Sequence, residues 1–104
     1  MEVTTNEQQI LMELIEKDLQ LESAFDVSKV TDDDRLLEEL SKVVRYLLDH
    51  DFSRLLHALY RIDIPEDKVK RVLSTTPPDN LSVILARAIL KREAEKVYFR
   101  IKYS

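Results

Sequence analysis

The chain of 104 residues contains no glycine, and this absence restricts the folds that it can adopt. Hairpin turns of types I′ and II′ depend heavily on glycine because their central residues take positive φ angles. The dinucleotide-binding fingerprint, the P-loop and the nucleophile elbow need glycine where the backbone turns sharply or approaches a phosphate. These three motifs are excluded, a hairpin-based β fold is unfavourable, and an all-α fold is the leading class.

Composition narrows the class further. The chain has no cysteine, which excludes disulfides, thiol nucleophiles and thiolate zinc sites. A hydrophobic content of 44% with 35% charged residues is typical of a globular protein, and no apolar run approaches the roughly 20 residues of a membrane span. The N-terminal sequence MEVTTNEQQ lacks the basic start and apolar stretch of a secretory signal. We therefore expect a cytoplasmic protein without a membrane partner.

Helical periodicity marks five segments of the chain. The first runs from about Thr5 to Leu21, and the last runs from about Asp79 nearly to the C-terminus. The three between them span about 31–50, 51–62 and 63–73. Several residues are placed to cap these helices: Thr5 with Gln8, Thr31, Asp51, Asp63 with Glu66, and Thr76 or Asp79.

The apolar pattern predicts how these helices pack. The segment LSVILARAIL is apolar almost all round, so we expect the last helix to lie centrally among the others. In its second half, the residues in line with the core are Leu90, Ala94, Val97 and Ile101. The least periodic stretch, ESAFDVSKV, is a connector that can insert Phe25, Val27 and Val30 into the core. The expected architecture is one domain, residues 1–104, formed by a compact bundle of about five helices with a long C-terminal helix.

A catalytic interpretation of Ser53 and His57 is possible on paper. The two residues are four apart, so a hydroxyl can approach an imidazole on one helical face, with Asp49, Asp51 or Asp63 to orient the ring. However, His57 projects away from the apolar face of its helix, and no oxyanion arrangement is evident. Because a catalytic base needs a defined and partly desolvated pocket, we expect no catalytic residues and no enzyme.

The sequence gives little indication of a metal site. His50 and His57 are seven residues apart with a helix break between them, unlike the i, i+4 spacing of zinc-binding histidines. The DDD run at residues 32–34 lacks the ligand spacing and the glycine of an EF-hand. We therefore predict no metal ligands and no cofactor, and we interpret the histidines and aspartates as residues that complement helix ends.

Charge is distributed unevenly along the chain. Residues 1–52 carry 5 basic and 14 acidic side chains, whereas residues 53–104 carry 11 basic and 6 acidic ones, within a net charge of −4. Attraction between the two halves of one molecule would explain this asymmetry. Alternatively, the basic half contacts a partner.

The end of the last helix carries a second stripe of side chains opposite the line that faces the core. Arg92, Lys96, Phe99 and Tyr103 follow i, i+4, i+7, i+11 spacing, and Arg100 adds a further charge. A helix of about 23 residues is about 35 Å long, which exceeds what the shorter helices can cover. An uncovered end with aromatic and basic groups predicts an interaction surface: Arg92, Lys96, Phe99, Arg100 and Tyr103.

Two partners fit this stripe. A homo-oligomer, or a complex with another protein, would cover the aromatic side chains. A nucleic acid would place its phosphates on the basic groups and its bases on the rings, although the acidic character of the whole chain disfavours this alternative. The sequence favours a protein-interaction module that self-associates through its C-terminal helix.

Two stretches, YLLDHDFSRLLHALYRIDIPEDKVKRVL and ILARAILKREAEKVYFRIKYS, resemble a family of uncharacterised small helical bacterial proteins. The resemblance covers roughly the last two-thirds of the chain. It implies a compact bacterial cytoplasmic domain. It carries no motif of assigned chemistry, and no catalytic or ligand residue is carried over from it.

Overall fold

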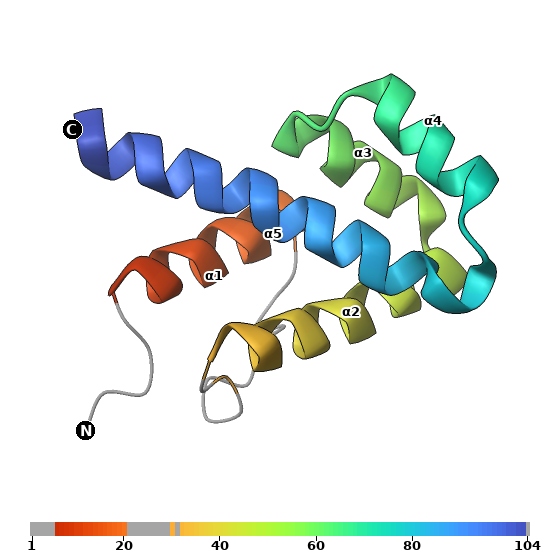
Figure 1. The fold of residues 1–104 in the computed structure, drawn as a ribbon, viewed down its shortest axis with the longest axis horizontal. Coiled ribbons are helices and arrows are strands. Elements are labelled where there is room, and N and C mark those ends of the chain that lie inside the picture. Colours follow the sequence, from red (N-terminus) through yellow and green to blue (C-terminus); the bar gives the residue numbers. More distant parts are fainter. Residues whose placement is uncertain (1–5, 21–29, 31, 104) are drawn as a thin grey trace.

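The computed structural model describes residues 6–20, 30 and 32–103, and every regular element among them is an α-helix (Figure 1). The predicted all-α fold with five helices is confirmed. None of the described helices combines the length and the apolarity that crossing a bilayer requires. The helices are α1 Asn6–Asp18, α2 Asp33–His50, α3 Phe52–Ile62, α4 Glu66–Thr75 and α5 Pro78–Tyr103.

Helix α5 is the central element, as the sequence predicts. It contacts each of the other four helices, which lie around it (Figure 1). Its 26 residues give it a length of about 39 Å at 1.5 Å per residue, close to the longest extent of the molecule, 42 Å. Helices α3 and α4 pack near its N-terminal half, whereas α1 runs beside its C-terminal half.

The buried apolar side chains form one continuous core between α5 and the surrounding helices. Val30 is fully buried in it, as expected for the connector, while Phe25 and Val27 lie outside the described residues. Burial of these side chains is the main favourable term in folding. The fully buried large apolar residues are Ile15, Leu19, Leu36, Leu40, Leu47, Leu55, Leu59, Ile62 and Ile89.

Aspartates terminate and start the middle helices, although not always those that the sequence suggests. Asp51 acts twice, since its N–H caps the end of α2 and its side chain accepts a hydrogen bond from the Arg54 N–H of α3. The predicted cap Thr31 is wrong, because Asp32 is the N-cap of α2 and accepts from the Arg35 N–H at 2.8 Å. Both aspartates satisfy backbone donors that have no partner inside the helix.

The predicted pairing of Asp63 with Glu66 at the start of α4 is also wrong. Asp63 instead ends α3 in the left-handed conformation, with φ of 75°, and Pro65 is the N-cap of α4 without a side-chain cap bond. Thr76 ends α4, and α5 starts at Pro78, so the last helix begins one residue before the predicted Asp79. Proline suits this first position because its fixed φ is helical and its missing N–H would have no partner.

The second half of α5 buries a different line of residues from the one predicted. Of the predicted line, Val97 is buried and Leu90 is half-buried, but Ala94 and Ile101 are exposed. The buried residues are instead Ile89, Glu93 and Val97, because α1 crosses α5 on that side. A glutamate therefore occupies a core position.

Candidate functional site

Four large side chains on the last two turns of α5 are exposed together. Tyr98, Phe99, Ile101 and Tyr103 have exposed fractions of 57%, 50%, 47% and 71%. We call these four residues the aromatic surface. They lie at the end of α5 that carries the C-terminus, where α1 is the only labelled helix alongside in Figure 1. An exposed group of rings at one end of a helix is a feature of interaction sites rather than of ordinary protein surface.

The rings of the aromatic surface contact one another and a cation. Phe99 meets Tyr98 edge-on at 5.4 Å between ring centroids, and it stacks on Tyr103 at 6.0 Å with 13° between the planes. The Lys102 ammonium lies 5.6 Å from the centroids of both Tyr98 and Tyr103. Edge-on and stacked pairs are favourable geometries for two aromatic rings. A cation near the face of a ring is also attracted to it. The side chains therefore present an organised surface before any partner binds.

A cleft adjoins the aromatic surface between α1 and α5. It has a volume of about 370 Å³, a smaller recess of about 220 Å³ lies beside it, and Glu7 and Tyr98 line both. Its lining combines two carboxylates, Glu7 of α1 and Asp33 of α2, with apolar side chains. The residues that line the cleft and the recess are Glu7, Gln8, Leu11, Asp33, Ala94, Val97, Tyr98, Ile101 and Lys102.

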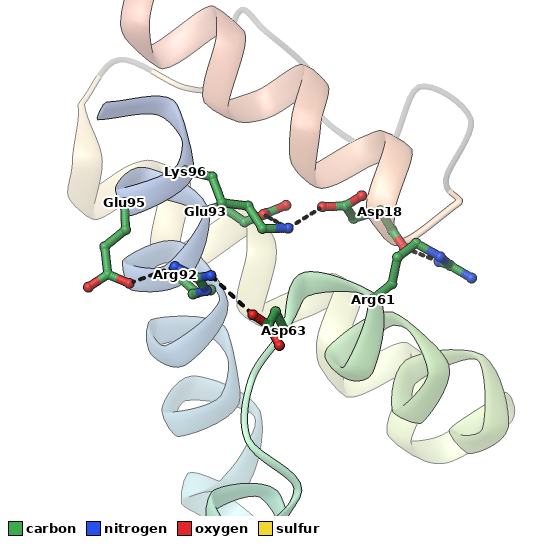
Figure 2. A network of polar contacts seen from close by, with 7 residues as sticks. All are labelled: Asp18, Arg61, Asp63, Arg92, Glu93, Glu95 and Lys96. Carbon is green, nitrogen blue, oxygen red and sulfur yellow. Dashed lines mark hydrogen bonds and ion pairs between the residues drawn. The ribbon is translucent and has the colours of Figure 1, made fainter. Parts of the chain in front are cut away.

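The structure divides the predicted stripe into two parts. Arg92 pairs with Asp63 at 3.3 Å and with Glu95 at 3.4 Å, so this guanidinium is engaged within the fold (Figure 2). Lys96 likewise lies between two carboxylates of the same chain. The other three residues, Phe99, Arg100 and Tyr103, are exposed at the end of α5.

Sequence reasoning missed two members of the aromatic surface. Ile101 was assigned to the line that faces the core, and Tyr98 was assigned to neither stripe. A signal was available, because the last six described residues, 98–103, are all aromatic, aliphatic or basic, and none of them is buried. Side chains at residues 98–103 are exposed on every side of α5, so their exposure depends on how close they lie to the end of the helix.

The residues considered for catalysis or for metal binding lie apart from this surface. Ser53 and His57 are both exposed on α3, so the imidazole lacks the desolvated surroundings that a catalytic base requires. His50 packs against Tyr46, with ring centroids 4.6 Å apart and 40° between the planes. Among residues 6–20, 30 and 32–103, no group of three or more potential ligands is placed to hold a metal ion.

Among the described residues, two ion pairs join the acidic half of the chain to the basic half: the exposed pair of Arg54 with Asp51, and the pair of Lys96 with Asp18. Lys96 from the basic half lies 3.4 Å from Asp18 of the acidic half, and this ion pair joins α5 to α1 (Figure 2). Several other ion pairs, such as Lys70 with Glu66, are exposed contacts within one helix, and such pairs contribute little to stability. Attraction between the two halves of the chain therefore explains the position of Lys96. It does not explain Arg100 and Lys102, which are exposed.

Comparison with protein-family models, curated proteins and solved structures finds no match to this chain. The aromatic surface and the adjoining cleft are therefore the features from which a function can be inferred.

Proposed function

We propose that this protein is a small protein-interaction module that self-associates through the aromatic surface of α5. The observation that carries the proposal is the exposure of Tyr98, Phe99, Ile101 and Tyr103 side by side, each at 47% or more. Tyrosine and phenylalanine contribute large contact areas with few rotatable bonds, and they are enriched in interfaces. No catalytic activity is part of the proposal, and the setting is a bacterial cytoplasm.

A second copy of the chain suits this surface because basic and acidic side chains both lie beside its rings. Arg100 and Lys102 make the end of α5 basic, and Glu7 and Asp33 line the adjoining cleft, with Lys102 beside Glu7 in its recess. In a two-fold dimer each contact occurs twice, so Arg100 of one copy can face the carboxylates of the other. The rings of both copies then meet near the axis and are removed from water.

Light scattering after gel filtration tests the proposal. At high micromolar concentration the wild-type chain should have the mass of a dimer, and Phe99→Glu should be a monomer because it places a charge at the centre of the ring cluster. Tyr46→Glu is the matched control, since Tyr46 is also an exposed ring and lies on α2, and this variant should remain dimeric. A monomeric wild type under these conditions would refute self-association.

A nucleic-acid-binding adaptor is the second candidate, and the position of Lys102 between two tyrosine rings favours it. Single strands bind by stacking bases on rings while cations contact the phosphates. Anisotropy of labelled DNA and RNA oligonucleotides at low salt measures this binding, which should weaken with added salt and with Arg100→Glu. No change in anisotropy with any oligonucleotide would eliminate this candidate.

A further inference from the structure

Glu93 is a fully buried carboxylate at the place where α1 packs on α5. Its exposed fraction is 0%, and neither of its oxygens accepts a hydrogen bond from a described residue. The Lys96 ammonium lies 3.3 Å from Oε1, which makes an ion pair without the geometry of a hydrogen bond. A buried ionised group without hydrogen bonds is costly in free energy. Burial at this position therefore favours the protonated, neutral form of Glu93.

A second buried carboxylate shares the same ammonium. Asp18, the last residue of α1, is 6% exposed, and its Oδ2 accepts a hydrogen bond from Lys96 at 3.4 Å. Figure 2 shows the Lys96 ammonium between the carboxylates of Glu93 and Asp18. With both carboxylates ionised, the cluster carries one unbalanced negative charge away from water. A single proton neutralises the cluster.

Two arginines also lie near this cluster, and the hydrogen bonds that they donate do not go to the carboxylates of Glu93 or Asp18. Arg61 of α3 donates to the backbone carbonyl of Asp18, and Arg92 of α5 turns to Asp63 (Figure 2). The residues that α2, α3 and α4 bury against the core are apolar. Burial is the largest cause that raises the pKa of Glu93, to about 7, followed by the hydrogen bond that the protonated carboxyl can donate to Asp18 and by the like charge of Asp18, while Lys96 opposes the rise.

We propose that Glu93, Asp18 and Lys96 form a proton-controlled latch, in which protonation of Glu93 fastens helix α1 onto α5 and ionisation of Glu93 loosens it. The protonated carboxyl supplies the donor that the cluster lacks and can bond to the Asp18 carboxylate. The latch does not depend on the proposed self-association. Because α1 supplies Glu7, Gln8 and Leu11 to the cleft, loosening of α1 also removes one wall of that cleft.

The direction of the pH effect follows from the two environments of Glu93. When α1 is docked, the pKa is about 7, and when α1 is released, water reaches the carboxyl and its pKa returns toward 4.5. The docked state therefore binds the proton more tightly, and docking weakens as pH rises toward 7 and through it. Between pH 6 and pH 8.5 the docking equilibrium should weaken about tenfold.

Hydrogen exchange of the α1 amides measures this equilibrium. The protection factor, which divides out the intrinsic exchange rate, should fall about tenfold in α1 between pH 6 and pH 8.5. In Glu93→Gln, which keeps the shape but cannot ionise, the protection of α1 should not change with pH. Glu95→Gln, an exposed glutamate two residues along the same helix, is the matched control and should behave as wild type.

Two further variants keep the Glu93 carboxyl and move its titration in opposite directions. Asp18→Asn removes the like charge and should shift the midpoint of the α1 transition to lower pH, whereas Lys96→Met removes the favourable cation and should shift it to higher pH. NMR titration of the carboxyl carbon of Glu93 reports the same midpoint directly. Equal pH dependence of α1 protection in the wild type and in Glu93→Gln, or shifts of the same sign in Asp18→Asn and Lys96→Met, would overturn the latch.

Discussion

Glu93 lies fully buried in the second half of α5, although glutamate is among the residues least often found inside proteins. In the sequence it stands within KREAEKV, where every charged residue looks like part of a solvated face. Its burial depends on Asp18 and Lys96, which are 78 residues apart and meet only in the folded chain. Local periodicity carries no information about such a contact. The same reason explains why Lys96 was predicted to be part of a surface.

At the residue scale, Glu93→Gln should stabilise the protein more at pH 8 than at pH 5. The folded-state pKa of Glu93 is about 7 and its ordinary value is 4.5, so the folded chain holds a proton that the unfolded chain has lost over this range. The stability that this proton contributes is fully present below 4.5 and is lost as pH rises through 7. The gain from the substitution should therefore grow by about 2 kcal/mol between pH 5 and pH 8.

Urea unfolding followed by circular dichroism at the two pH values measures this difference. Glu95→Gln should show no comparable dependence, because Glu95 is exposed and its charge remains in water. A gain in Glu93→Gln that is the same at pH 5 and pH 8 would contradict the raised pKa.

At the scale of elements, the sequence predicts the helices better than their ends. The middle helices carry wide apolar stripes and end at capping aspartates, so Asp51 and His50 were placed correctly. Where two residues could each act as a cap, as with Thr31 and Asp32, the local pattern does not decide between them. Helix α5 contacts all four neighbours, and a helix that is apolar on several sides gives no single stripe from which its buried line can be deduced.

The lack of glycine also affects helix ends. Glycine is the usual residue where a chain leaves a helix in the left-handed conformation. Here Gln20 and Asp63 take that conformation instead, with φ of 55° and 75° after α1 and α3. A residue with a Cβ atom is less stable in this region than glycine, so the ends of these two helices store a small amount of strain.

Gln20→Gly should therefore stabilise the protein. Glycine removes the steric cost of the left-handed conformation, which exceeds the entropy that glycine loses on folding, so we expect a gain of about 0.5 kcal/mol. Lys17→Gly is the matched control, because Lys17 is an exposed residue within α1, and it should cost about 1 kcal/mol. Thermal unfolding of both variants measures the two effects. A loss of stability in Gln20→Gly comparable to that in Lys17→Gly would show that the left-handed position stores no strain.

At the scale of the whole molecule, α5 combines two roles along its length. Its N-terminal and middle parts hold the core, while its last two turns, where α1 is the only labelled helix alongside in Figure 1, present the aromatic surface. The length of this helix was evident from the sequence, and so was the exposure of Phe99 and Tyr103. The adjoining cleft was not, because Glu7, Asp33 and Tyr98 come from three helices whose arrangement only the fold defines.

Self-association through one end of the molecule should make stability depend on protein concentration. A ligand that binds the folded state stabilises it by mass action, and a second copy is such a ligand. Once most chains are dimeric, a hundredfold increase in concentration should raise the melting temperature by about 5 °C for a chain of this size. Calorimetry at several concentrations measures this shift.

Replacing three exposed rings separates association from folding. The variant with Tyr98→Ser, Phe99→Ser and Tyr103→Ser should lose the concentration dependence, because it lacks the side chains that a second copy would cover. Its melting temperature should match that of the dilute wild type within a few degrees, since the three rings lie outside the core and serine has a similar helix propensity. Tyr46→Ser should keep the dependence. A variant that melts far below the dilute wild type would show that the rings stabilise the monomer itself, and the surface would then be part of the fold rather than a site for a partner.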